Sequence, residues 1–498
     1  MNIADIQHMH ENGRLEVKLS THGKIPTSLW QSYSSFANTN GGTIALGIEE
    51  DNKRNLRIVG VPNVHNLVSM FWNNVNDGNT VSSNILVDED VRIEHIDDKD
   101  VIIIDVPRAP RSFRPVYTGK NPLTGTWRRK GEGDYRCSND EIRSMLRDQD
   151  DESIDKTVVE EIGLEAIDHD TLNAYKNMFR TRHPDHPWLK LPDDELLWKL
   201  GAAQRLSGDR NLHPTRAGLL MFGDERYITD EFSKYLLDFR MVSDPTQQRW
   251  DDRVMSADGT WPGNVFGFWL RVITKLTDGL PVPFNLSDGL IRNDDTPLRR
   301  AVREALTNAL GHADYLGRTG VVIVRYGNER ITFRNPGALR IEPSVIELGG
   351  VSDVRNETIM KMFNLLGIGE RAGSGFDTMR EGTRSAGLPD PELIEELNPD
   401  RTTLVLPITA STHSHQQEIQ QEPDVASILL SLTGKEAEVF HLFANGDQLK
   451  TNEVAQRLNV SDTRARVLLK SLVAKRLLVR YGNSRNTIYS VKNRNTSH

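Results

Sequence analysis

One segment of the chain repeats polar side chains at the spacing of an α-helix. Glu304, Asn308 and His312 stand four residues apart within residues 299–312, so on a helix they share one face. A face that packed into a core would carry Leu or Val at these positions. A carboxylate, an amide and an imidazole suit a magnesium–nucleotide site, where an amide or carboxylate oxygen binds the cation and a carboxylate orients a water. The same spacing also fits a solvated helix face.

The sequence that follows supplies a turn and a loop that such a site needs. Asn335-Pro336-Gly337 comes directly after residues that are predicted to form strands, 321–324 and 331–333. Glycine permits close backbone approach and exposes amide groups to a phosphate chain, and a helix predicted to begin near Phe376 would point its positive end at the same place. The loop residues are Gly367, Gly369, Gly373, Ser374 and Gly375.

This order of polar helix, turn and glycine loop resembles the GHKL ATPases, the gyrase, histidine kinase and MutL group, in the divergent form found in many bacterial regulators. The resemblance implies that Glu304 is the catalytic or water-orienting carboxylate and that Asn308 binds Mg²⁺. Asn335 and Gly337 would stand where the family reads adenine, and residues 367–375 would form the phosphate lid over ATP. Most active members carry Asp where Asn335 stands. ATP binding is therefore predicted, and hydrolysis and adenine specificity are left open.

A second group of charged residues lies near the N-terminus. Glu16 and Lys18 are two residues apart and would project from one side of a strand. Glu11 precedes them, and Glu50 follows a predicted strand over residues 43–48. In metal-dependent nucleases, carboxylates hold the metal and a lysine steadies the hydroxide or the charge that develops on phosphorus. Taken alone, a Glu-x-Lys pair is an ordinary surface ion pair.

The sequence around these residues resembles the Schlafen AlbA-type domain over most of residues 5–146. The resemblance rests on Phe-Ala-Asn-Thr-Asn-Gly-Gly at 36–42 and on the spacing of Glu11 and Glu16, which match two of its carboxylates. Glu50 stands where the cleaving members carry Asp. The family fold implies nucleic-acid binding, with RNA or tRNA as targets, and vertebrate members cleave RNA with three carboxylates and a divalent cation, Mg²⁺ or Mn²⁺. Binding without cleavage is the favoured interpretation.

The C-terminal segment is basic. Residues 433–498 carry 12 Lys and Arg against 5 Asp and Glu, a net charge of +7. The whole chain has a net charge of −9, so the other residues together carry −16. Predicted helices at 434–443 and from Thr451 onward precede a third helix and a hairpin, in the order of a winged helix-turn-helix. A basic module on an acidic body indicates DNA binding. The alternative use of a winged helix is contact with another protein.

The third helix of this module is expected to read the DNA. Ala465, Val467, Leu468 and Leu472 are predicted to face inward, and the hairpin covers residues 477–480 and 487–491. The outward side chains of the helix would contact phosphates or base edges in the major groove, and one further arginine would lie near the tip of the wing. These residues are Arg464, Arg466, Lys470 and Arg485.

Composition limits the class of protein. With 498 residues, 37% of them hydrophobic and 26% charged, the chain is expected to form three or more globular domains. A single cysteine, Cys137, cannot form an internal disulfide and is interpreted as structural, and together with the lack of a membrane span or signal peptide it favours the cytoplasm. The predicted fold is α/β and α+β in several domains. These are residues 1–148, a connecting region 153–290, a nucleotide domain 291–408, a linker 409–425 and a winged helix 426–498.

The connecting region is predicted to contain helices near 169–180 and 193–206 and a buried strand or helix at 215–222, with no recognisable chemistry. The hypothesis for the whole chain is a regulator, expected to be a homo-oligomer, in which ATP controls DNA binding through the winged helix. The alternative is a Schlafen-like metal-dependent nuclease acting in antiphage defence. A third hypothesis is a scaffold in which both sites are vestigial.

Overall fold

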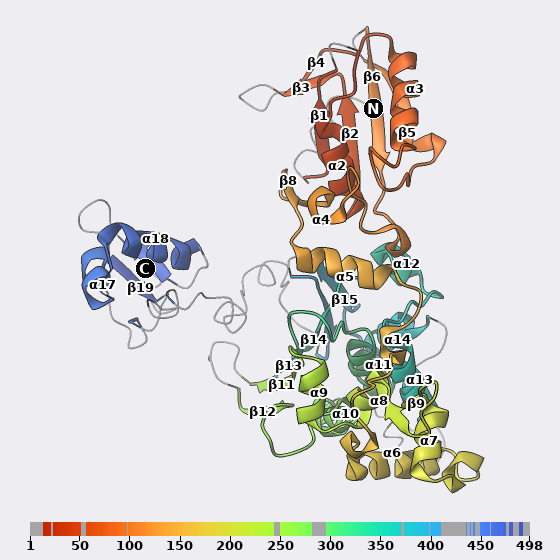
Figure 1. The fold of residues 1–498 in the computed structure, drawn as a ribbon. Coiled ribbons are helices and arrows are strands. Elements are labelled where there is room, and N and C mark those ends of the chain that lie inside the picture. Colours follow the sequence, from red (N-terminus) through yellow and green to blue (C-terminus); the bar gives the residue numbers. More distant parts are fainter. Residues whose placement is uncertain are drawn as a thin grey trace. The chain divides into compact units, whose positions relative to one another are not determined.

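The chain divides into two compact units, residues 1–410 and 411–498. Both mix helices and strands, as the sequence predicts for a multidomain α/β protein (Figure 1). None of the helices in the described portion of the chain is long and apolar enough to span a membrane. The computed structural model describes residues 13–20, 23–50, 56–96, 98–243, 250–280, 295–369, 373–397, 399–409, 435, 439, 442–443, 449–458, 460–474, 478–481 and 488–491.

The N-terminal domain combines a four-stranded sheet with covering helices. Its elements are β1 (Leu15–Lys18), α2 (Ser28–Ala37), β2 (Gly42–Leu46), β3 (Ile48–Glu50), β4 (Leu56–Ile58), α3 (Val64–Val75), β5 (Val91–Ile96), β6 (Lys99–Val106), α4 (Pro122–Gly125), β7 (Trp127–Lys130), β8 (Gly133–Arg136) and α5 (Asn139–Gln149). The strand order is β1-β2-β6-β5, with β1 and β2 parallel and the other pairs antiparallel. Alternate residues of β6 face opposite sides, so Ile102 and Ile104 pack under α2 and α3 while Val101 and Ile103 pack with β3 and β4.

The middle of the chain forms a six-stranded sheet. Its strands are β11 (Leu237–Val242), β12 (Asp252–Met255), β13 (Val321–Tyr326), β14 (Arg330–Pro336), β15 (Glu392–Glu396) and β16 (Arg401–Pro407). Their order is β12-β11-β13-β14-β16-β15, with β11 and β13 parallel and every other adjacent pair antiparallel. Two strands come from the predicted connecting region 153–290 and four from the predicted domain 291–408. The sheet and one shared core therefore extend across the boundary placed at residue 290.

Helices pack on this core. They are α6 (His169–Arg182), α7 (Asp193–Leu200), α8 (Arg216–Phe222), α9 (Glu225–Glu231), α10 (Val265–Thr277), α11 (Pro297–Gly311), α12 (Pro343–Leu348), α13 (Glu357–Leu365) and α14 (Gly375–Ser385), with a small hairpin of β9 (Ala203–Arg205) and β10 (Leu212–Pro214). The prediction of a helix over 193–206 is wrong beyond Leu200. Gly201 takes a left-handed conformation with φ of +84°, which ends α7 and lets the chain turn into β9.

Helix α11, which carries the polar repeat, is defined at its start by capping. The Thr296 side chain accepts a hydrogen bond from the Arg299 backbone N–H at 3.2 Å, and Pro297 occupies the first turn. Apolar residues of α11 at helical spacing, Val302 and Leu306 among them, are fully buried in the core. Burial of this face fixes the rotation of the helix, and so the direction in which its polar residues point.

The C-terminal unit is a small helix–sheet module. Its elements include β17 (Leu449–Lys450), α17 (Thr451–Arg457), α18 (Asp462–Ala474), β18 (Leu478–Tyr481) and β19 (Ile488–Val491), with sheet order β17-β19-β18. Helix α17 begins at Thr451, where the sequence predicts a helix to start, and its N-cap is Lys450. Val467 is 54% exposed, so the prediction that it faces inward is wrong, and Leu469 is buried in its place. Residues 465, 468, 469 and 472 form one helical stripe, and 467 falls outside it.

Candidate nucleotide site

A cavity of about 560 Å³ lies beside α11 in the middle domain. Glu304, Asn308 and His312 all line it, so the polar face of the helix is turned toward this hollow. Its other walls come from β14, β15, β16, α13, α14 and the chain between β14 and α13. Apolar side chains form much of the lining, among them Phe333, Ile346, Phe376, Met379, Leu393 and Leu404. A mostly apolar wall with a few converging polar groups is typical of a site for a small molecule.

Glu304 and Asn308 are coupled to each other and covered by the start of α14. The Asn308 Nδ2 donates a hydrogen bond to Glu304 Oε1 at 3.1 Å. The amide oxygen of Asn308 therefore points away from the Glu304 carboxylate. A Cβ atom at Gly375 would lie 2.6 Å from Glu304 Oε1 and 2.9 Å from Asn308 Nδ2. Only glycine therefore allows α14 to begin against this pair. Two turns further along α14, Gly382 has the same role, because a Cβ there would lie 2.5 Å from Ala301 Cβ.

Asn335 lies at the end of β14, opposite Thr402 of β16. Both line the cavity, and the amide Nδ2 of Asn335 donates a long hydrogen bond, 3.4 Å, to the Pro336 carbonyl. Gly337, which the sequence places with Asn335, does not line the cavity. Its φ of +105° and its contact with Arg355, whose Nη1 would be 2.5 Å from a Cβ, show that glycine is needed here for close packing.

The glycine loop reaches the cavity at one end. Gly373 and Gly375 line the cavity, whereas Gly367, Gly369 and Ser374 do not, and residues 370–372 lie outside the described residues. Gly373 has φ of +81°, and a Cβ there would lie 2.4 Å from the Val351 backbone nitrogen. The loop therefore packs against the segment that follows α12. It borders the hollow where it enters α14.

Cationic side chains complete the lining, and the sequence pattern did not predict them. Arg340, Arg355 and Lys361 border the cavity together with the carboxylates Asp353 and Glu357. They come from the connection between β14 and α13 and from α13 itself. Thr402, which faces Asn335, was also missed. For the three cations, the sequence shows only that basic residues lie between the turn at 335–337 and the glycine loop. Basic residues are common on any protein surface, so this pattern does not indicate a site.

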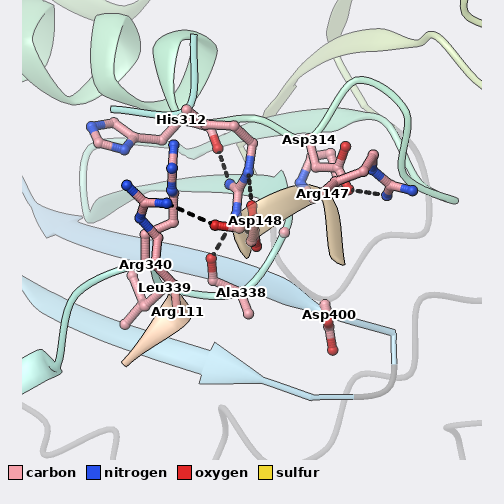
Figure 2. Close-up of polar contacts among 12 residues, drawn as sticks. Arg111, Arg147, Asp148, His312, Asp314, Ala338, Leu339, Arg340 and Asp400 are labelled. Atoms are coloured by element: carbon pink, nitrogen blue, oxygen red, sulfur yellow. Dashed lines mark hydrogen bonds and ion pairs between the residues drawn. The ribbon is translucent and has the colours of Figure 1, made fainter. Parts of the chain in front are cut away.

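His312 is the C-cap residue of α11 and lies next to these charged side chains. Burial, followed by the positive charges of Arg355 and Arg340, lowers the pKa of the His312 imidazole from 6.5 to about 4. Figure 2 shows the His312 ring beside the Arg340 side chain. At neutral pH the imidazole is therefore uncharged. It offers a hydrogen-bonding nitrogen to the cavity and adds no positive charge.

This shift predicts a pH dependence of stability. Between pH 6.5 and pH 4 the unfolded chain binds a proton at His312 that the folded chain does not, so we expect the free energy of unfolding to fall as the pH is lowered, by at most about 1.4 kcal/mol per pH unit. Urea titrations at pH 7, 6 and 5 measure this slope. A His312→Asn variant should show a smaller slope across the same range, and an unchanged slope would contradict the assignment.

Glu16, one of the N-terminal carboxylates expected to bind a metal, forms ion pairs with two cationic side chains. Lys18 Nζ lies 2.7 Å from Glu16 Oε1, and Arg129 Nη1 lies 2.9 Å from Glu16 Oε2. Arg129 also bonds to Asp134 and stacks over the Phe36 ring, so it is fixed within the domain. Lys18 and Glu16 do project from one side of β1, as the sequence predicts. Both carboxylate oxygens are engaged within the domain.

The remaining predicted N-terminal ligands are not brought into a metal cluster among the described residues. Glu50 is exposed at the end of β3, and Glu11 lies outside the described residues. Within the described segments no group of three or more His, Cys, Asp or Glu side chains is arranged to hold a metal ion. Cys137 is buried, and burial raises the pKa of its thiol to about 12, so the group is neutral.

In the C-terminal unit the predicted DNA-contacting residues of α18 are all on its surface. Arg464, Arg466 and Lys470 are exposed, while Ala465 and Leu469 on the opposite side are buried. Arg485 lies outside the described residues. The exposed Val467 stands among the three cations, which places one apolar side chain in a basic helix face.

Three segments of the chain match known protein families. Residues 11–138 match the family described as "Schlafen, AlbA_2". The N-terminal domain is therefore similar to Schlafen AlbA_2 domains. Residues 320–406 match the family described as "Putative ATP-dependent DNA helicase recG C-terminal", and residues 143–238 match a domain of unknown function. The AlbA_2 match confirms the expected N-terminal domain, and the second match covers β13 to β16 but begins after α11.

The solved structures that are similar to the chain include the following two. The DIP2311 protein from Corynebacterium diphtheriae has 17% identity and a TM-score of 0.40, with 98% of this chain and 96% of that chain covered. The N-terminal domain of a "Putative ATP-dependent DNA Helicase RecG-related Protein" from Nitrosomonas europaea has 22% identity and a TM-score of 0.22, with 27% and 89% covered. No curated protein matched the chain.

Proposed function

We propose that this chain is an ATP-binding and nucleic-acid-binding regulator. The observation that carries the proposal is the Glu304–Asn308 pair, which faces a cavity of about 560 Å³ under the glycine-rich start of α14. The volume lies in the range of small-molecule sites, about 300–1,000 Å³. The helicase-related family match over residues 320–406 supports a nucleotide as the occupant, because that family is described as ATP-dependent.

The residues that line the cavity fit a magnesium nucleotide in their chemistry. The Asn308 amide oxygen is a hard ligand of the kind Mg²⁺ takes, and Glu304 stands beside it to orient a water. Arg340, Arg355 and Lys361 supply positive charge for a triphosphate, and the first turn of α14 supplies backbone N–H groups. Asn335 and Thr402 present an amide and a hydroxyl where a base would lie. Bound Mg²⁺ would neutralise phosphate charge.

Two regions of the chain are proposed to contact nucleic acid. The Schlafen AlbA_2 domain at residues 11–138 supports binding of nucleic acid, including RNA, and the basic face of α18 supports binding of DNA. In this proposal α18 is the recognition helix of a winged helix-turn-helix. The ATP-bound state alters the packing and self-association of the chain, and with them its affinity for DNA.

The proposed DNA-binding face predicts a specific salt dependence. Replacing Arg464, Arg466 and Lys470 together by alanine removes exposed cations from α18 and leaves its buried stripe intact. We expect weaker DNA binding at every sequence, and a slope of log affinity against log salt that is shallower by about 0.9 for each phosphate that these side chains no longer neutralise. Fluorescence anisotropy over a salt series measures both. A triple variant with the wild-type affinity and slope would show that this face does not bind DNA.

Calorimetry with ATP, GTP and a non-hydrolysable ATP analogue, each with and without Mg²⁺, tests the nucleotide site directly. We expect saturable binding of the ATP analogue that requires Mg²⁺ for full affinity. Absence of heat with every nucleotide, confirmed by an unchanged melting temperature, would overturn the proposal. Incubation of the same preparation with tRNA and with single- and double-stranded DNA in Mg²⁺ and Mn²⁺ tests the nuclease alternative. The cation contacts of Glu16 give that alternative no support.

A further inference from the structure

The N-terminal domain and α5 are joined to the middle domain by a series of ion pairs. Five of these pairs are largely buried and join an arginine to a carboxylate, and in four of the five the arginine belongs to the N-terminal side. Figure 2 shows a portion of this interface, with Asp148, Arg147 and Arg111 approaching the loops around His312, Asp314 and Arg340. The pairs are Arg108–Glu395, Arg111–Asp353, Arg128–Asp400, Arg147–Asp314 and Asp148–Arg355.

Two of these pairs end on residues that line the nucleotide cavity. Arg355 lines it and is held on its other side by Asp148 of α5, with Nε to Oδ1 at 3.0 Å and Nη2 to Oδ2 at 2.9 Å. The same guanidinium donates to the carbonyl oxygens of His312 and Ala338. Arg355 is 7% exposed, so little solvent screens it. Asp148 is thus the carboxylate that neutralises a cation of the cavity wall.

In the second pair the charges are reversed: the residue that lines the cavity is the carboxylate, and the residue on the N-terminal side is the arginine. Asp353 lines the cavity, and its carboxylate is shared between Arg111 of the N-terminal domain and Arg340 of the cavity wall, whose Nη2 lies 3.3 Å away. Arg111 also donates to the carbonyl oxygens of Asp148 and Asp150 at the end of α5. Arg111 therefore ties α5 to Asp353. By sharing this carboxylate, Arg111 also leaves Arg340 less tightly engaged by it.

We infer that nucleotide binding in the cavity and docking of the N-terminal domain are coupled through Asp148–Arg355 and Arg111–Asp353. The inference rests on the proposed nucleotide site. A polyanion in the cavity competes with Asp148 for Arg355 and with Asp353 for Arg340. The phosphates draw Arg355 away from Asp148, which weakens a bond that holds α5. They also draw Arg340 away from Asp353, which leaves the Asp353 carboxylate more fully to Arg111. ATP therefore loosens the contact of α5 at Asp148 and strengthens the contact of Arg111 at Asp353, and by linkage these two docking contacts set the ATP affinity.

Two substitutions on the N-terminal side are expected to change the Mg–ATP affinity in opposite directions. Asp148→Asn removes the charge that competes for Arg355, so we expect tighter binding of Mg–ATP. Arg111→Gln takes one cation away from Asp353, so this carboxylate engages Arg340 more fully and adds net negative charge at the cavity wall. We expect this variant to bind Mg–ATP more weakly. Couplings between sites commonly change affinity about fivefold or more, and we expect a change of that order in each direction, although neither residue lines the cavity.

Arg147→Gln is the matched control. Arg147 precedes Asp148 on α5 and pairs with Asp314 of the middle domain at 2.6 Å, and Asp314 does not line the cavity. This variant weakens the same interface without changing the charge of a cavity residue. We expect the Mg–ATP affinity of Arg147→Gln to equal that of the wild type. The full-length chain is used throughout, with circular dichroism as the check of folding.

Calorimetry with Mg–ATP analogue measures the affinities of the wild type and the three variants, and hydrogen exchange of α5 and residues 111–113 measures docking. Faster exchange of α5 but not of residues 111–113 in the wild type on addition of analogue, with opposite affinity changes in Asp148→Asn and Arg111→Gln, supports the coupling. Wild-type binding combined with affinities in both variants equal to that of Arg147→Gln overturns the coupling alone. No binding by the wild type overturns the nucleotide site itself. Should Asp148→Asn not fold, Arg111→Gln decides, because Arg111 is partly exposed and its loss leaves no buried unpaired cation.

Discussion

The Asn308→Ala variant is expected to lose the magnesium-dependent component of its ATP affinity. Asn308 lines the cavity and is positioned by its hydrogen bond to Glu304, so alanine removes the proposed ligand oxygen while α11 keeps its buried face. Even residues that only support a metal ligand typically cost about 10–100-fold in metal affinity when replaced. We therefore expect Mg–ATP to bind at least about tenfold more weakly. In EDTA the affinity for free ATP should match that of the wild type.

Arg303→Ala is the control for this measurement. Arg303 is on the same helix, and its guanidinium pairs with Asp295 rather than with a cavity residue. Loss of this pair should leave the nucleotide affinity unchanged with and without Mg²⁺. Equal Mg²⁺ dependence in Asn308→Ala and the wild type would show that Asn308 does not hold the cation, and the assignment of the polar face of α11 would fall with it.

The second large effect concerns stability. We expect Arg128→Ala to lower the free energy of unfolding by about 3–5 kcal/mol, the cost of removing one partner of a buried ion pair. Arg128 on β7 has a side chain only 1% exposed, and its Nη1 and Nη2 lie 2.5 and 3.2 Å from the two carboxylate oxygens of Asp400. Alanine leaves the Asp400 carboxylate with little solvent and without this cation. Urea unfolding of the full chain, followed by fluorescence and circular dichroism, measures the change.

An exposed ion pair across the same two domains provides the comparison. Arg318 pairs with Asp140, and the two side chains are 64% and 43% exposed. Arg318→Ala should change the free energy of unfolding by no more than about 1 kcal/mol, because water screens an exposed pair. Similar losses in the two variants would mean that burial does not set the strength of these contacts, contrary to the physical argument.

The polar repeat on α11 illustrates how much local sequence can show. The spacing of Glu304, Asn308 and His312 predicts a shared face because helical geometry is set by the backbone, and the structure places all three on one cavity wall. Gly375 is predictable for a different reason, because the residue type alone shows where the backbone can approach more closely than any side chain would permit. The same argument also predicts Gly367 at the cavity, but a Cβ there would meet Arg182 and not the cavity.

Periodicity was a weaker guide where one residue decides the end of an element. The helix predicted over 193–206 stops at Leu200 because Gly201 adopts a left-handed conformation, and a glycine inside a helical pattern does not by itself show whether the helix continues. Val467 was predicted inward on hydrophobicity alone. Its neighbours Leu468 and Leu469 occupy the buried stripe, and a third adjacent position on a helix cannot face the same way.

Local features of this protein could be predicted from the sequence alone: the polar face of α11, the glycine that lets α14 approach it and the basic face of α18. Each depends on the geometry of a few consecutive residues. Only the tertiary structure decided that strands from 237–255 and 321–407 share one sheet, that Thr402 faces Asn335, and that Arg355 and Asp353 connect the cavity to Asp148 and Arg111. These contacts join residues that are far apart in the sequence, and no local pattern encodes which distant partners the folded chain brings together.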